Sequence, residues 1–133
     1  MSKSKLSVGM DIRDILVQSD ALKAYIGTNV FPLVAPEDTE GDFIIFARTN
    51  YGSQLSLMGV ADEYCEITYN IVSSNYLRGV EIAEVFRNLL QDITVDKEPL
   101  YIGRAREDYV GEGNLIKYVQ ILPVSIGMTP SEN

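Results

Sequence analysis

The sequence predicts an α+β domain in which two main helices pack on one face of a mostly antiparallel sheet of about four to five strands. Residues 64–73 alternate apolar and polar side chains, which is the period of a half-buried strand. Residues 75–92 repeat apolar side chains at helical spacing. Residues 100–109 and 115–126 flank Gly111-Glu112-Gly113-Asn114, a composition typical of a hairpin turn. The expected element order is α-β-β-β-α-β-β, with antiparallel pairing throughout the sheet.

The N-terminal region is expected to form a broken helix. Its first part carries apolar residues at helical spacing, namely Val8, Ile12, Ile15 and Leu16. Ser19 or Asp20 then caps a second short helical piece over residues 21–26. Gly27 is a plausible residue to end that piece, because glycine tolerates the left-handed backbone of a helix C-terminus.

Two extended segments follow this helix. Residues 30–34 are expected at a sheet edge or an irregular position, because Pro32 cannot donate a ladder hydrogen bond. Residues 43–51 form a strand that begins with the continuous apolar run Phe43-Ile44-Ile45-Phe46. Such a run predicts coverage on both faces, by helices or by a neighbouring subunit.

The second main helix, residues 75–92, is expected to bury one apolar stripe. The predicted stripe consists of Val80, Ala83, Phe86, Leu89, Leu90 and Ile93. The chain length fits one domain over residues 1–133 with a core of about residues 8–126. Residues 1–6 and 128–133 are expected to be disordered tails.

The composition excludes several classes of function. The chain has 133 residues with 19 acidic and 11 basic side chains, for a formal net charge of -8. Because binding to nucleic-acid phosphates needs clustered lysine and arginine, no sequence-specific nucleic-acid binding is expected. The one cysteine cannot form an intramolecular disulfide, and no segment approaches the ~20 apolar residues that cross a membrane. With no secretion signal after the basic N-terminus, the chain is expected in a cytoplasm or in a particle assembled there.

A search for reactive groups ends without a site. The sequence contains no histidine, and so lacks the commonest general base and metal ligand. Cys65 occupies an inward position of the alternating strand, which favours a buried apolar role. The acidic run 37–42 lacks the ligand spacing of a calcium loop and is interpreted as a solvated loop. Gly111 and Gly113 lack the third glycine and the following helix of a phosphate loop. We therefore predict no catalytic residue, no metal ligand and no cofactor.

The long connection between the two central strands, residues 52–62, is the best candidate for an interaction surface. Its apolar residues would be exposed on a lone monomer. The candidate subunit-interface residues, with Tyr51 at the end of the preceding strand, are Tyr51, Leu55, Leu57, Met58 and Val60. Two interpretations stay open: the connection contacts another subunit, or it lengthens the flanking strands into a longer hairpin that folds onto its own core.

Several stretches together resemble the phage tail completion or tail terminator family. They are Ser-Asp-Ala-Leu-Lys-Ala-Tyr-Ile-Gly at 19–27, Val-Phe-Pro-Leu-Val-Ala-Pro at 30–36 and the apolar run at 43–46. The strand and helix beginning at residue 64 also fit the family's pattern of a strand, Ser-Tyr and an amphipathic helix. The resemblance covers residues 10–126. One departure is that Asp42 stands where relatives commonly place a proline.

The resemblance implies a virion component of a long-tailed phage or an integrated prophage, assembled in the bacterial host cytoplasm and located in the tail. Relatives form a six-fold ring that caps the finished tail tube, presents a surface for joining the head and leaves a lumen for DNA. The implied partners are further copies of the chain, the tail tube protein and head-completion or connector proteins, with no membrane. The alternatives are another head-tail connector or neck protein of the same particle, an enzyme that uses carboxylates and a metal, and a regulatory protein that binds a metal or a small molecule.

Overall fold

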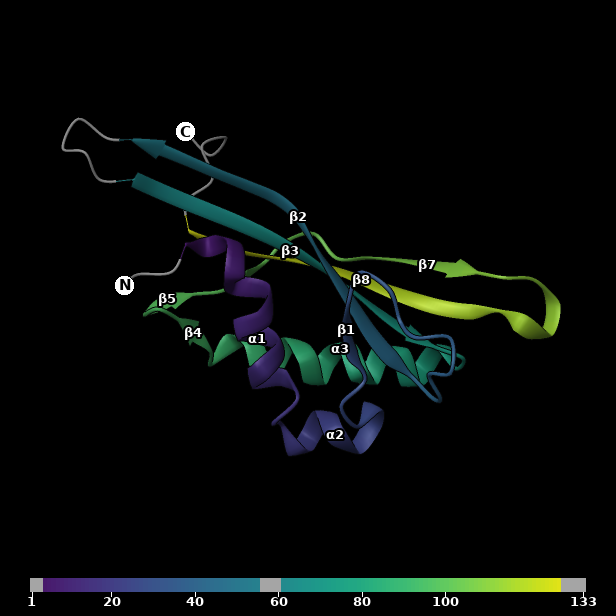
Figure 1. Ribbon diagram of the computed structural model, residues 1–133. Coiled ribbons are helices and arrows are strands. Elements are labelled where there is room, and N and C mark those ends of the chain that lie inside the picture. The colour runs from purple at the N-terminus through teal and green to yellow at the C-terminus, as the bar shows by residue number, and fades with distance from the viewer. Residues whose placement is uncertain (1–3, 56–60, 128–133) are drawn as a thin grey trace.

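The computed structural model describes residues 4–55 and 61–127. In chain order the elements are the 3-10 turn η1 (Lys5–Ser7), helices α1 (Val8–Leu16) and α2 (Asp20–Ile26), strands β1 (Val30–Pro32), β2 (Phe43–Leu55) and β3 (Ala61–Ser73), helix α3 (Tyr76–Gln91), short strands β4 (Thr94–Val95), β5 (Glu98–Pro99) and β6 (Tyr101–Ile102), strand β7 (Arg106–Val110), the 3-10 turn η2 (Gly113–Leu115) and strand β8 (Lys117–Gly127). The helices lie on one side of the sheet (Figure 1). The predicted α+β fold class is confirmed, although η1 lies partly within the segment we expected to be a disordered tail.

The main sheet has the strand order β1-β2-β3-β8-β6, and β7 also pairs with β8. All pairs are antiparallel except β1 with β2, which run parallel from Val30 opposite Ile44 to Pro32 opposite Phe46. The prediction of antiparallel pairing throughout is therefore wrong at this edge. The connection 33–42 carries the chain back to the end of the sheet where β1 began, so β2 starts in the same direction.

Strands β2 and β3 form a hairpin much longer than predicted. Their ladder runs from Phe43 opposite Val72 to Leu55 opposite Ala61 and shifts register between Arg48 and Asn50. Most of the connection predicted at residues 52–62 is therefore strand. For the described residues, the flanking strands do lengthen into a hairpin, whereas contact of this connection with another subunit stays a prediction.

The apolar run at the start of β2 is covered on one face only. Ile44 is fully buried and Phe46 is 6% exposed, whereas Phe43 and Ile45, which alternate with them, are half-buried. Within one chain the helices cover only the side of Ile44 and Phe46, so coverage of the other face by a neighbouring subunit stays a prediction. The other face of the sheet retains a row of half-buried apolar side chains.

Helix α3 begins where the sequence predicts, and the Asn75 side chain accepts a hydrogen bond from Arg78 N at 2.9 Å as its cap. Its buried stripe is Gly79, Ile82, Phe86 and Leu90. The predicted stripe is thus rotated: it included Val80, which is half-buried, and omitted Ile82, which is fully buried. The contact of Phe86 with Tyr69 of β3, at 4.8 Å between ring centroids, is part of the packing that sets this rotation.

The broken N-terminal helix is confirmed with one difference. The Ser19 side chain accepts a hydrogen bond from Leu22 N at 3.2 Å, and Gly27 ends α2 with φ 60°. Ile15, predicted to face the core, is 37% exposed. Helix α1 approaches the sheet closely at Gly9, where a Cβ atom would lie 3.2 Å from the Phe46 ring.

An ion pair between buried Asp42 and partly exposed Arg78 fixes the start of β2. Asp42, where the resembling family commonly has proline, is 8% exposed and accepts a hydrogen bond from Arg78 Nε at 2.7 Å. Arg78 Nη2 also donates to the Tyr25 carbonyl at 3.0 Å, and its guanidinium lies 5.0 Å from the Tyr25 ring centre. Arg78 therefore joins α3, α2 and the turn before β2. A carboxylate at position 42 supplies a charged acceptor for the Arg78 guanidinium, which a proline side chain lacks.

The segment predicted as one strand over residues 100–109 is two strands, β6 and β7, separated by residues 103–105. The β7–β8 hairpin is confirmed. Gly111 in its turn has φ 96°, and a Cβ atom there would lie 2.3 Å from the Leu115 carbonyl oxygen. Only glycine fits such a position without a shift of the backbone.

Candidate assembly surfaces

The structure places two of the five predicted interface residues. Tyr51 lies half-buried on the helix-facing side of β2, where it packs against the core. Leu55 is the last residue of β2 in the ladder. Leu57, Met58 and Val60 lie outside the described residues. Their assignment to a subunit interface stays a prediction.

The β2–β3 hairpin extends beyond the rest of the sheet (Figure 1). Strand β8 ends at Gly127 opposite Tyr64, so residues 53–55 and 61–63 pair with each other at the edge of the main sheet. A Cβ atom at position 127 would lie 2.2 Å from the Glu63 carbonyl oxygen, and Gly127 has φ 86°. We call residues 53–55 and 61–63 the arm; a two-stranded ribbon of this kind is only marginally stable by itself in water.

The base of the arm is held by the N-terminal turn. The Tyr51 hydroxyl donates a hydrogen bond to Glu63 Oε2, and Lys5 N donates to the same oxygen at 3.3 Å. The hydrogen bond from Tyr51 lowers the pKa of the Glu63 carboxyl and raises the pKa of the Tyr51 hydroxyl. The ammonium of Lys5 forms an ion pair with Glu98 at 2.8 Å. The arm therefore leaves the body from a fixed position.

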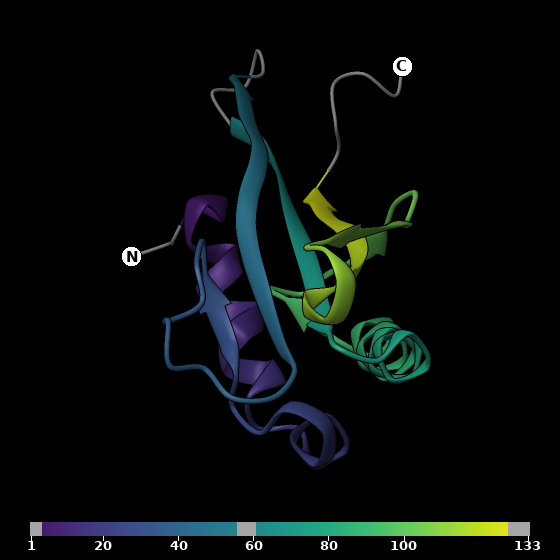
Figure 2. The ribbon, with the colours of Figure 1, turned by 90° about the vertical axis from the view of Figure 1, so that its right-hand side faces the viewer.

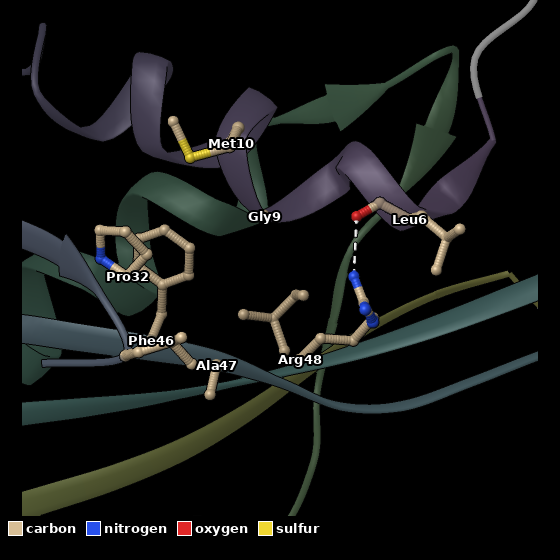
Figure 3. A pocket seen from close by; sticks show the side chains of 9 residues that line it. Leu6, Gly9, Met10, Pro32, Phe46, Ala47 and Arg48 are labelled. Atoms are coloured by element: carbon tan, nitrogen blue, oxygen red, sulfur yellow. Dashed lines mark hydrogen bonds between the residues drawn. The ribbon is translucent and has the colours of Figure 1, made fainter.

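An apolar groove lies between the N-terminal helix and β2, and we call it the β2 groove (Figure 3). It has a volume of about 290 Å³ and is lined by Leu6, Gly9, Met10, Pro32, Leu33, Phe46, Ala47, Arg48 and Ile67. Three of its apolar side chains face solvent: Leu6 is 45% exposed, Met10 48% and Leu33 70%. Leu33 also has φ 68°, a backbone conformation that is uncommon for a leucine. These residues combine an exposed apolar surface with a hollow, which is typical of a docking surface.

The β2 groove adjoins an open strand edge. Leu33 N donates to the Phe46 carbonyl at 2.9 Å, which is the last backbone bond from the β1 side onto β2. Within the described residues, β2 has no strand partner on that side from Ala47 to Leu55. Arg48 Nη1 donates to the Leu6 carbonyl at 3.2 Å, as the dashed line in Figure 3 marks. Unpaired edges of this kind are places where another chain can bind.

A second group of exposed apolar side chains lies near the turn of the β7–β8 hairpin, on both of its faces because side chains alternate along β7, and we call this group the hairpin tip. It comprises Tyr109, 62% exposed, Val110, 55% exposed, and Leu115, 80% exposed. Figure 1 shows this hairpin projecting from the end of the sheet opposite to the arm, and Figure 2 shows the molecule from that end. Side chains this large and this exposed are unusual in such a group on a monomer.

The hairpin tip is anchored to the body. The Tyr76 hydroxyl, at the start of α3, donates to Glu107 Oε2 at 2.8 Å, and Gln120 Nε2 donates to the same oxygen at 3.0 Å. Tyr76 and Tyr118 also pack edge to face at 5.8 Å. The hydrogen bonds from Gln120 and Tyr76 lower the pKa of the Glu107 carboxyl. The hairpin is thus positioned before any partner binds, which reduces the entropy lost on binding.

The described residues offer little reactive chemistry. They contain no group of three histidine, cysteine, aspartate or glutamate side chains that could hold a metal ion. Cys65 is fully buried, and burial raises the pKa of its thiol, so it resembles a core residue more than a nucleophile. Among the described helices, none is long and apolar enough to cross a membrane.

With one exception, no pattern in the sequence indicated the β2 groove or the hairpin tip. Leu6 precedes α1, Met10 lies outside its apolar stripe, and Leu115 is the last residue of the turn η2. One pattern in the sequence could have indicated the groove. Leu33 and Val34 follow Pro32 at a sheet edge, where two consecutive apolar side chains cannot both be buried. In the structure they are 70% and 72% exposed.

Comparison with known proteins identifies a related fold. No protein-family model matches the sequence. No curated protein matches it either. The structure is similar to that of a chain in the virion of a native gene transfer agent particle, with a TM-score of 0.69 and 15% sequence identity. The similarity covers 87% of this chain and 90% of that chain. At this identity the likeness shows a shared fold over nearly the whole of both chains.

Proposed function

We propose that this chain is a structural component of a phage-like virion and that it acts as a tail terminator. In this role several copies form a ring on the end of the tail tube, stop further tube subunits from adding and provide the surface to which the head is joined. The function depends on identical contacts between subunits, which repeat until the ring closes. No bond in a substrate is made or broken.

The observation that carries this proposal is the shared fold with a chain of the gene transfer agent virion. The match covers nearly the full length of both chains, so it concerns the whole domain and not one common motif. It agrees with the family resemblance found in the sequence at residues 19–27, 30–36 and 43–46. Because fold does not by itself imply function, the surfaces of the chain must also suit the role.

Three features of the described residues suit an assembly protein. The arm, the β2 groove and the hairpin tip are separate surfaces at different places on the sheet. A subunit in a ring between tube and head needs contacts to its neighbours and to the proteins above and below it. We assign the arm, with the predicted interface residues Leu55, Leu57, Met58 and Val60, to a contact within the particle.

Loss of the gene from its phage or prophage tests this function. A tail terminator limits growth of the tube, so particles made without it are expected to have tails of excessive and variable length by electron microscopy. A plasmid that supplies the intact gene is the matched control and should restore the normal length.

Two other results would contradict the terminator role. Tails of normal length without heads would indicate the alternative, a head-tail connector or neck protein of the same particle. Complete particles of normal shape would indicate that the chain has no structural role in the virion. In solution, the terminator role also predicts a concentration-dependent assembly, with six times the 14.8 kDa chain mass for the six-fold ring of the resembling family.

A further inference from the structure

We propose that the β2 groove of one copy of this chain binds the hairpin tip of a second copy. This inference deepens the proposed function, on which it rests, because it names the contact that would join neighbouring subunits of the ring. The partner is therefore another molecule of the same chain.

The first argument is shape. The β2 groove is a hollow of about 290 Å³, and its lining includes the buried side chains of Phe46 and Ile67. The hairpin tip is a projection, and its most exposed side chain is Leu115 at 80%. A projecting apolar side chain fits an apolar hollow, and its burial there removes apolar surface from water.

The second argument is topology. Strands β1 and β2 form one edge of the sheet, and β6 and β7 form the other. The β2 groove and the hairpin tip therefore lie on opposite edges of one chain. Two different complementary surfaces on opposite sides give a head-to-tail contact, which is the type of contact that closes into rings of identical subunits.

The third argument is charge. Among the described residues that line the groove, Arg48 is the one with a charged side chain. Residues 106–117, which form the hairpin end, contain three carboxylates and two cations, Arg106 and Lys117, so the hairpin end has a net negative charge. Complementary charge of this kind orients two subunits as they meet and disfavours a contact of the hairpin with a second hairpin.

Two charged substitutions test the contact separately. Leu33→Asp places a carboxylate in the groove, at a position whose positive φ aspartate tolerates better than leucine does. Leu115→Asp places one on the hairpin tip. Tyr101→Asp, on an exposed residue of β6 outside both surfaces, is the matched control. The measurement is the mass in solution by light scattering across a concentration series.

The expected result has three parts. Wild type and Tyr101→Asp assemble alike, and each of the other two variants alone gives the monomer mass of 14.8 kDa. An equimolar mixture of Leu33→Asp and Leu115→Asp gives a dimer and nothing larger. The intact groove of the Leu115→Asp chain binds the intact hairpin of the Leu33→Asp chain, and no further copy can add.

Other results separate failure of this contact from failure of the proposed function. The groove-hairpin contact is contradicted if wild type assembles and either variant assembles equally well, or if the mixture stays monomeric. Neither result contradicts the proposed ring. If wild type stays monomeric at high concentration, both alone and with purified tail tubes, the terminator role is overturned together with the contact.

Discussion

Tyr69 at the centre of the core carries a polar atom in an apolar site. Its side chain is fully buried between the rings of Phe46 and Phe86, at 5.6 Å and 4.8 Å between centroids. The hydroxyl has no hydrogen-bond partner among the described residues, and burial raises its pKa. A buried hydroxyl without a partner costs free energy that a phenylalanine ring would not.

We therefore expect Tyr69→Phe to stabilise the protein by about 1 kcal/mol, because it removes the unpaired hydroxyl and keeps the ring. Urea unfolding monitored by circular dichroism gives the free energy of unfolding of both proteins. Tyr51→Phe is the matched control, and it should destabilise because the hydroxyl of Tyr51 donates to Glu63. A loss of stability in Tyr69→Phe would show that the hydroxyl has a favourable interaction in solution.

Single residues also show that a local sequence pattern does not predict contacts between residues far apart in the chain. The resemblance to the tail terminator family left Asp42 unexplained, since relatives commonly have proline there. The explanation is its ion pair with Arg78, which lies 36 residues further along the chain. No local pattern predicts a pairing over that distance. The cap at Ser19 was predictable, because it depends on a hydrogen bond to a residue only three positions away.

At the scale of elements, the arm depends on contacts at its base. Glu63 accepts hydrogen bonds from Tyr51 and from the backbone of Lys5, and its pKa is lowered below the ordinary value of 4.5. A carboxyl whose pKa is lower in the folded state stabilises the fold above its unfolded-state pKa. This contribution disappears as the pH falls through the folded-state value.

We expect Glu63→Gln to reduce the acid sensitivity of the protein. The Tm of wild type should fall more than that of the variant as the pH is lowered from 7 to about 3, since the amide does not titrate. Differential scanning calorimetry across this range measures both. Glu84→Gln, at an exposed carboxylate of α3, serves as control and should follow wild type. Equal acid sensitivity in Glu63→Gln and wild type would contradict a stabilising role for the ionised Glu63.

The types of the elements were largely predictable, and their extents were less so. The helices at 8–16, 20–26 and 76–91 follow from apolar spacing and caps. The length of the β2–β3 hairpin did not follow from the sequence, because Gly52 and Ser53 are typical of loops and yet lie within β2. The rotation of α3 was also missed, since the residues buried on a helix depend on the surface against which it packs.

At the scale of the whole molecule, the net charge of the protein determines how strongly it binds nucleic acid. The net charge of -8 opposes binding to a phosphate backbone. In the proposed ring the lumen must let DNA pass without holding it, which an acidic protein allows.

We expect the purified protein not to retard duplex DNA in a gel at low salt, about 50 mM, where electrostatic binding is strongest. Retardation at this salt that disappears at about 200 mM would show a basic surface formed on assembly and would contradict this expectation. The test should be made with the assembled form as well as the monomer, because a ring can gather charges that are separated in one chain.

The sequence by itself determined the fold class and the order of the main elements, because these depend on local periodicity and caps. The expectation of an assembly role came from the apolar connection between the central strands and from the resemblance to the tail terminator family. The tertiary structure alone decided which apolar residues stay exposed and where they gather. Leu6, Met10 and Leu33 line one groove, while Tyr109, Val110 and Leu115 are exposed near the turn of the hairpin at the opposite edge of the sheet. Burial depends on which elements lie against each other, and the parallel pairing of β1 and the packing of α1 against β2 follow from contacts between distant parts of the chain.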